Sequence, residues 1–233
     1  MAASIPQNWA PTAYGTPTNT ASATSPIGSS SAVAVWAFAQ GGTPTDGVSN
    51  FTVTVAGAAA TFAVGHVEGI QNGELYYVAN VTSGTMPSVS VTANAGQAQS
   101  FGTQFIASEI GGVSTTSPFV QFSAATNVFV LLLNSGPVNS TSGNLLMGSA
   151  TDSFAGLIEG SFSSGSTNAG VGSGYSAGVG WSGDWQVSAG GSISYTDNGS
   201  GGFAISVISE WAASGGPPPA TKPFDVIFYS MNF

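Results

Sequence analysis

The sequence predicts an all-β protein, an antiparallel β-sandwich or jelly roll with an internal duplication and extended arms at both ends. Short apolar stretches separated by Gly, Ser and Asn turns recur along the chain, and some alternate strictly, as in residues 51–55 (FTVTV). No stretch of ten or more residues has helical periodicity, and the helix-favouring residues Lys, Arg, Glu and Leu are scarce. A strand ending in Ser-Glu occurs twice, at residues 106–110 (IASEI) and 207–211 (VISEW), which indicates a duplication.

The amino-acid composition limits the partners and the chemistry that are possible for this chain. The chain has 233 residues, of which 42% are hydrophobic and only 5% are charged, whereas about a quarter of the residues in an ordinary globular protein are charged. Lysine and arginine together number one, and the net charge is −9. Nothing is therefore present to neutralise phosphates, which argues against nucleic-acid partners and against electrostatic binding to membranes. The absence of cysteine excludes disulfides and thiol chemistry.

The first half begins with a low-complexity arm over residues 1–31, which cannot bury enough surface to fold alone. Either the arm is a flexible leader, or it docks onto a neighbouring subunit through Ile5, Trp9 and Tyr14. The apolar and alternating patterns that follow predict strands over residues 32–39, 51–55, 61–67, 74–81, 88–93 and 101–110. We expect a hairpin-type turn at Asn72-Gly73.

Residues 118–134 form a predicted connection with strand-like runs, and the second half starts at residue 144. We expect long loops from 160 to 183, which are rich in Gly and Ser, with Trp181 and Trp185 flanking a turn. Strands are predicted over 186–195 and 202–211, and a Pro-rich linker from 215 precedes a last strand over 224–233. One domain over residues 32–214 then interleaves two halves, 32–113 and 144–214.

The order VAVWAFA, FTVTV, ELYYVANVTSGTMPSVSVTAN, FIASEIGGV, NLLMGSA and AISVISEW resembles a β-sandwich pattern that recurs in uncharacterised bacteriophage virion proteins and bacterial surface proteins. The resemblance covers about residues 30–214 and includes Tyr76, Tyr77, Asn80 and the Ser-Glu positions. It implies a structural or adhesive module and carries over no catalytic residues. The chain departs from that pattern in its near-complete lack of basic residues.

Few side chains suggest chemistry. Glu109 and Glu210 could be the paired carboxylates of a glycosidase, but their repetition favours equivalent structural positions at strand ends. His66 and Glu68 would share one face of a strand, although one histidine is poor evidence for a metal. A calcium site in the loops is an alternative to plain turn chemistry for the four acids beside turn residues, Asp46, Asp152, Asp184 and Asp197. We expect no catalytic, cofactor or metal residues.

We therefore predict a non-enzymatic virion structural protein, either a capsid decoration or another surface component of a bacteriophage. Its partners would be other copies of itself, for example in a trimer, and a major capsid or other virion protein. Contacts would come from Ile5, Trp9 and Tyr14 in the first arm and from Phe224 and Phe228 in the last strand. The N-terminus lacks the pattern of a signal peptide, so we expect synthesis in the host cytoplasm and display on the virion surface.

Two alternatives remain open. The first is a glycan-binding or host-attachment module that stacks Trp181 and Trp185 on sugar rings. The second is a subunit of a bacterial surface filament, in which the last strand is donated to the next protomer.

Overall fold

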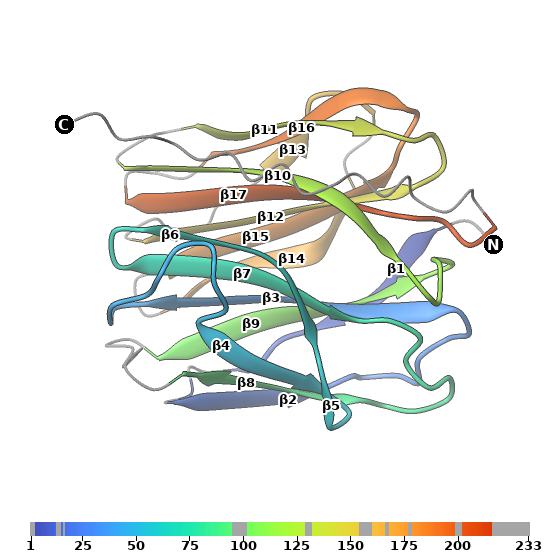
Figure 1. Ribbon diagram of the computed structural model, residues 1–233, viewed down its shortest axis with the longest axis horizontal. Coiled ribbons are helices and arrows are strands. Elements are labelled where there is room, and N and C mark those ends of the chain that lie inside the picture. Colours follow the sequence, from blue (N-terminus) through green and yellow to red (C-terminus); the bar gives the residue numbers. More distant parts are fainter. Residues whose placement is uncertain are drawn as a thin grey trace.

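The computed structural model describes residues 3–12, 15, 17–94, 102–128, 132–153, 160–165, 168–176, 179–198 and 202–215. Over these residues the chain forms seventeen β-strands and no helix. The strands gather in four antiparallel sheets (Figure 1). Sheets pack against one another as in a β-sandwich, which confirms the predicted fold class.

The first repeat is built from two sheets. Its inner sheet has the order β1 (Ser4–Trp9), β9 (Thr103–Gly111), β3 (Ser31–Gln40), β7 (Gln71–Val78) and β6 (Thr61–Glu68). Its outer sheet has the order β2 (Thr18–Ser22), β8 (Ser88–Ala93), β4 (Phe51–Val55) and β5 (Ala58–Ala59).

The second repeat has the same organisation. Its inner sheet has the order β10 (Phe119–Val128), β17 (Phe203–Trp211), β12 (Leu145–Ser153), β15 (Val179–Val187) and β14 (Asn168–Ser176). Its outer sheet has the order β11 (Leu133–Ser140), β16 (Gly191–Asp197) and β13 (Gly160–Phe162). In both repeats the first strand lies in the inner sheet and the second in the outer sheet. A jelly roll also needs such exchange between two sheets, and that finer assignment stays a prediction.

The duplication is therefore present, but each copy is longer than the sequence suggested. Residues 1–31 were predicted to lie outside the sandwich, yet β1 pairs with β9 and β2 pairs with β8. The predicted connection over residues 118–134 likewise contributes β10, which pairs with β17. The expected loops from 160 to 183 contain β13, β14 and the first part of β15. The last strand predicted over 224–233 lies outside the described residues.

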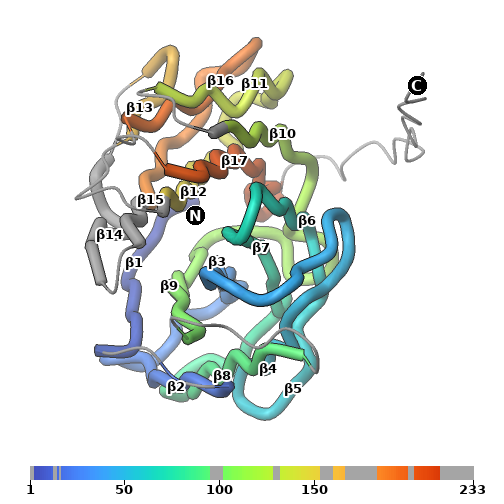
Figure 2. Tube along the Cα trace, turned by 90° about the vertical axis from the view of Figure 1, so that its left-hand side faces the viewer, coloured from blue at the N-terminus to red at the C-terminus, as the bar shows by residue number. Residues whose placement is uncertain are grey.

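The four sheets form a stack in which the two inner sheets face each other and each outer sheet covers the far side of its own inner sheet (Figures 1 and 2). Three cores fill the stack. The central core lies between the inner sheets and includes Trp36, Leu75, Met147 and Trp211. The first outer core fills the first repeat and the second outer core fills the second repeat. The halves are thus two sandwiches back to back and not one interleaved sandwich.

This layering explains the two kinds of strand pattern. Every residue of β3 is buried, because its sheet is covered on both faces, and its sequence SAVAVWAFAQ is apolar almost throughout. Strand β4 lies in an outer sheet, and its sequence FTVTV alternates between buried and more exposed positions. Strand β16 in the other outer sheet shows a similar alternation.

The two repeats meet with their edge strands crossed. Strand β10 of the second repeat lies against β6 of the first, and β14 lies against β1. Strand β10 is the counterpart of β1, and β14 is the counterpart of β6. Exchanging the two repeats therefore converts one contact into the other. A two-fold rotation would produce this arrangement, as in a symmetric dimer.

Candidate functional site

Glu109 and Glu210 occupy equivalent positions in the two repeats. Glu109 pairs with Val33 of β3, and Glu210 pairs with Leu146 of β12. Both glutamates are buried, with 2% and 0% of their surface exposed. Each glutamate also faces a glutamine on the edge strand at the other side of its own strand. Glu109 pairs with Gln7 of β1, and Glu210 pairs with Gln121 of β10.

The Glu109 carboxylate is fully engaged by its own repeat. Its Oε1 accepts hydrogen bonds from the Gly28 amide at 2.8 Å and the Ser31 hydroxyl at 2.8 Å. Its Oε2 accepts a hydrogen bond from Gln7 Nε2 at 2.8 Å. The acid thus fastens the edge strand β1 and the start of β3 to β9, and charge-assisted bonds of this kind are stronger than neutral ones.

Glu210 repeats this pattern. Its Oε1 accepts hydrogen bonds from the Thr141 amide at 2.8 Å, Asn144 Nδ2 at 2.8 Å and the Ser140 hydroxyl at 2.9 Å. Its Oε2 accepts a hydrogen bond from Gln121 Nε2. In both repeats a glutamine side chain, a backbone amide and a side chain at the start of the central strand hold the acid. We call each arrangement a carboxylate clasp.

The two clasps do not form one catalytic site. Glu109 lies on the same face of β9 as Phe105 and Ala107, which belong to the first outer core. Glu210 lies on the same face of β17 as Ile208, in the second outer core. Both inner sheets stand between the two carboxylates, and packed sheets are about 10 Å apart. The acid pair of a glycosidase must flank one cleft, so the structural interpretation of the repeated Ser-Glu is the right one.

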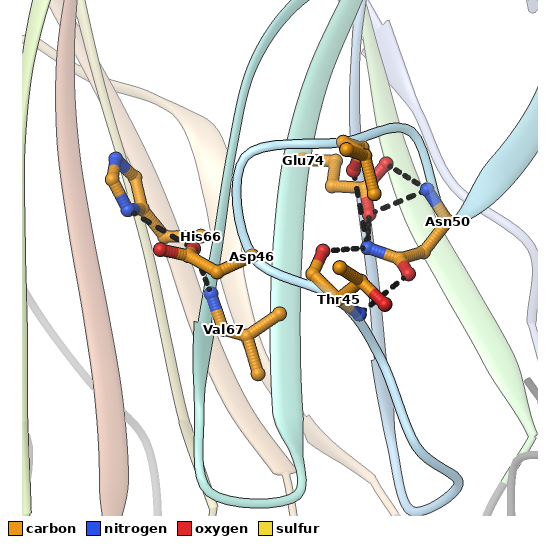
Figure 3. Close-up of polar contacts among 7 residues, drawn as sticks. Thr45, Asp46, Asn50, His66, Val67 and Glu74 are labelled. Carbon is orange, nitrogen blue, oxygen red and sulfur yellow. Dashed lines mark hydrogen bonds and ion pairs between the residues drawn. The ribbon is translucent and has the colours of Figure 1, made fainter. Parts of the chain in front are cut away.

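A third buried acid, Glu74 in β7, was not singled out by sequence reasoning (Figure 3). It accepts hydrogen bonds from the Asn50 amide at 3.0 Å, from Asn50 Nδ2 at 2.7 Å and from the Tyr76 hydroxyl. Asn50 also bonds the backbone of Thr45 in both directions, so Glu74 holds the loop before β4 in place. Burial raises the pKa of Glu74, an effect that the hydrogen bonds from Tyr76 and Asn50 only partly offset.

Tyr76 shares this environment. Burial raises the pKa of its hydroxyl, and the neighbouring Glu74 charge raises it further. The hydroxyl is 3.1 Å from the Phe51 carbonyl oxygen and 2.8 Å from the Ser49 hydroxyl. Tyr76 therefore remains neutral, and the network ties β7 to β4 across the first outer core. The only sequence signal was an acid placed beside an apolar run, in GELYYV.

His66 pairs with an acid other than the one its sequence spacing suggested (Figure 3). His66 Nδ1 lies 3.5 Å from Asp46 Oδ1, and the same oxygen accepts a hydrogen bond from the Val67 amide at 3.0 Å. The Asp46 side chain is 63% exposed, so this contact lies at the surface. Among the residues that the structure describes, no group of three or more His, Cys, Asp or Glu residues could hold a metal ion.

The other acids considered for calcium lie in strands and not in loops. Asp152 belongs to β12, Asp184 to β15 and Asp197 to the end of β16, and all three are buried. Asp184 accepts a hydrogen bond from the Tyr195 hydroxyl at 2.6 Å. These acids are parts of the second sandwich.

The two tryptophans predicted to stack on sugars also lie in a strand. Trp181 and Trp185 belong to β15, where they pair with Thr151 and Met147. The Trp185 side chain is partly buried and packs against the central core, so it is not a loop aromatic. The side chain of Trp181 lies outside the described residues.

The predicted docking anchors of the first arm pack within their own chain. Ile5 packs against the central core, and Trp9, 5% exposed, belongs to the first outer core. Both are structural parts of the first repeat, and their contact with a neighbour stays a prediction. Tyr14, Phe224 and Phe228 lie outside the described residues.

A row of aromatic rings at the surface was missed by sequence reasoning. Tyr77 stacks on Phe119 with ring centroids 5.7 Å apart, and Phe119 stacks on Phe122 at 6.4 Å. The buried Trp211 meets Tyr77 and Phe119 edge-on, at 5.8 and 5.5 Å. The row therefore runs from the central core to Phe122, which is 40% exposed. We call Tyr77, Phe119 and Phe122 the aromatic row.

The chain matches no protein-family model, no curated protein and no solved structure. The resemblance to virion and surface β-sandwich proteins accordingly stays a prediction. Within the described part of the chain, no helix has the length and apolar character needed to span a membrane.

Proposed function

We propose that this chain is a non-enzymatic structural protein of a bacteriophage virion, displayed as a capsid decoration or another surface component. The observation that carries the proposal is the use made of the buried carboxylates. Glu109, Glu210 and Glu74 each accept three or more hydrogen bonds that fasten strands and loops of the same chain. A general acid or base needs a free proton position facing a substrate, and these oxygens are committed to architecture.

The composition supports a role that depends on robustness. The two repeats bury continuous apolar sheets in three cores, and the surface of the chain carries few charges. The single basic residue, Lys222, is followed by Pro223, a bond that trypsin cuts poorly. Resistance to proteolysis suits a protein displayed outside the cell.

Particle composition tests this proposal. We expect density-purified virions from the source of this sequence to contain the chain in many copies, with antibody against the recombinant protein labelling their surface. Detection by mass spectrometry must use chymotrypsin, because trypsin would yield almost no peptides. A major capsid protein from the same particles serves as the reference for copy number. Finding the chain only in the soluble lysate, with none in intact particles, would refute the proposal.

A further inference from the structure

The aromatic row extends the central core to the surface of the molecule. Its rings become more accessible in order, from Trp211 at 0% exposed to Phe122 at 40%. Stacked rings that continue a core outward leave a flat apolar face to solvent at the last ring. Exposed apolar features of this kind mark interaction sites more often than scattered single residues do.

Two rings of the aromatic row, Phe119 and Phe122, lie on β10, an edge strand of the second repeat's inner sheet. Among the described strands, β10 pairs only with β17, and its sequence FVQFSAATNV contains no charged residue and no proline. Its counterpart β1 is shorter and carries Pro6, a residue that lacks the amide needed for pairing. Natural edge strands are usually protected by charge, proline or shortness. Thus the sequence of β1 carries such protection, whereas the sequence of β10 carries none; β10 contacts β6 and β11 but forms no strand pair with either.

The described chain ends near the start of β10, on the side that pairs with β17. The Ala212 amide donates a hydrogen bond to the Pro118 carbonyl, next to Phe119, and the described residues stop at Gly215. The remaining sequence, 216–233, reads GPPPATKPFDVIFYSMNF. From Phe224 it is rich in the Val, Ile, Phe and Tyr residues that favour strands. It also holds Lys222, the only basic residue of a chain with net charge −9.

We infer that residues 224–233 of a second copy dock on the aromatic row and pair with the free edge of β10. Apolar side chains of the segment cover Phe122 and Phe119, while main-chain hydrogen bonds extend the inner sheet of the second repeat by one strand. Lys222 reduces the repulsion between two acidic molecules at the contact. The prolines 217–219 favour an extended spacer of about 3.1 Å per residue between the described chain and the segment.

This contact is heterologous, since each copy offers one segment and one aromatic row. Such contacts produce closed rings where the rotation closes and open filaments where it does not. The inference concerns self-association of the isolated protein, so it can fail while the chain is still found in virions, and the reverse also holds.

Three proteins test the inference by light scattering during size-exclusion chromatography over a range of concentrations. The full chain should form oligomers, and both a chain truncated after Gly215 and the Phe122→Ser variant should be monomers. Met86→Ser is the matched control, because Met86 is an exposed apolar side chain elsewhere, 54% accessible. It should assemble like the full chain. Circular dichroism and urea unfolding establish that each variant is folded.

Mixing provides the decisive measurement. The truncated chain keeps the aromatic row but lacks the segment, and the Phe122→Ser chain keeps the segment but lacks a complete row. Mixed in equal amounts, they should form a heterodimer that grows no further. A monomeric full chain at every concentration, whether its segment is free or docked on its own β10, would overturn the inference. So would oligomers that survive truncation, or a glycan ligand that binds a monomer through Phe122.

Discussion

The Glu210 clasp allows one perturbation to be worked out quantitatively. In Glu210→Gln one carboxylate oxygen becomes an NH2 group, which cannot accept a hydrogen bond. Oε1 serves three donors, from Ser140, Thr141 and Asn144, and Oε2 serves Gln121. The least costly orientation places the NH2 toward Gln121 and loses one charge-assisted hydrogen bond, worth about 1.5–3 kcal/mol. The remaining three bonds also weaken, because their acceptor is now neutral.

We therefore expect Glu210→Gln to lower the free energy of unfolding by about 2–4 kcal/mol. At about 2–4 °C per kcal/mol for a chain of this size, the midpoint of thermal unfolding falls by roughly 4–16 °C. Equilibrium unfolding in urea at neutral pH measures the free energy, and calorimetry measures the midpoint. Glu109→Gln should give a loss of similar size, since its Oε1 and Oε2 serve the equivalent donors.

Glu68→Gln is the matched control. Glu68 ends β6 and is only partly buried, and no hydrogen bond or ion pair of its side chain is seen within the described structure, so its substitution should change stability by less than about 0.5 kcal/mol. If Glu210→Gln and Glu68→Gln were equally mild, the clasp would not stabilise the fold and the reasoning would be wrong. A large loss at Glu210 with none at Glu109 would contradict the equivalence of the two repeats.

Three further predictions follow from the buried groups. Burial raises the pKa of Glu74 above its usual 4.5, so its contribution to stability is complete below that pH and is lost as the pH rises through the raised pKa. The stability advantage of wild type over Glu74→Gln should shrink as the pH rises above 4.5, and an advantage that grew would contradict this sign. Trp185→Ala should destabilise by about 2–3 kcal/mol in urea, as expected for a half-buried core residue, and an unchanged midpoint would restore Trp185 as a ligand-facing residue. Deleting residues 1–31 removes β1 and β2 with Trp9 and should unfold the first repeat; a truncated chain as resistant to chymotrypsin as the full chain would show that the segment is a separate arm.

The strand patterns were readable from sequence wherever burial follows local composition. The apolar run of β3 and the alternation of β4 predicted strands correctly, because the sheets around them impose these patterns. Together the two patterns even distinguish inner from outer sheets. The equivalence of Glu109 and Glu210 was also predicted, since a repeated motif implies a repeated environment.

Residues 1–31 were wrongly predicted to lie outside the sandwich, because the strands they form pair with strands far away in the sequence. Strand β1, SIPQNW, has neither a dense apolar run nor alternation. Its place is fixed by pairing with β9 and by the bond from Gln7 to Glu109, 102 residues away in the sequence. The composition of a segment indicates how much apolar surface the segment can bury by itself. It does not indicate whether another strand, here β9, has an unpaired edge to which the segment can hydrogen-bond.

The Gly-rich residues 160–183 were wrongly predicted to be loops for a different reason. Glycine usually signals a turn, but several glycines here are strand residues that make room for large side chains. A Cβ on Gly148 of β12 would fall 2.3 Å from the Tyr195 ring, and one on Gly160 of β13 would fall 1.7 Å from the Tyr195 hydroxyl. Close approach across a sandwich thus explains glycine in these strands, and a sequence gives no sign of which residue fills the space.

The central core shows what the fusion of two repeats permits. By register, Trp36 of β3 is equivalent to Ser149 of β12, and Gly73 of β7 is equivalent to Trp181 of β15. A Cβ on Gly73 would fall 2.5 Å from the Trp36 ring, so the indole of the first repeat depends on that glycine. Two identical subunits would place the same bulky residue on both sides of a two-fold axis, where overpacking costs about 1–3 kcal/mol or more. A covalent tandem is free of this constraint, because Ser149 stands in the second repeat where Trp36 stands in the first. The central core therefore holds one Trp36 indole, where a pair of identical first repeats would hold two.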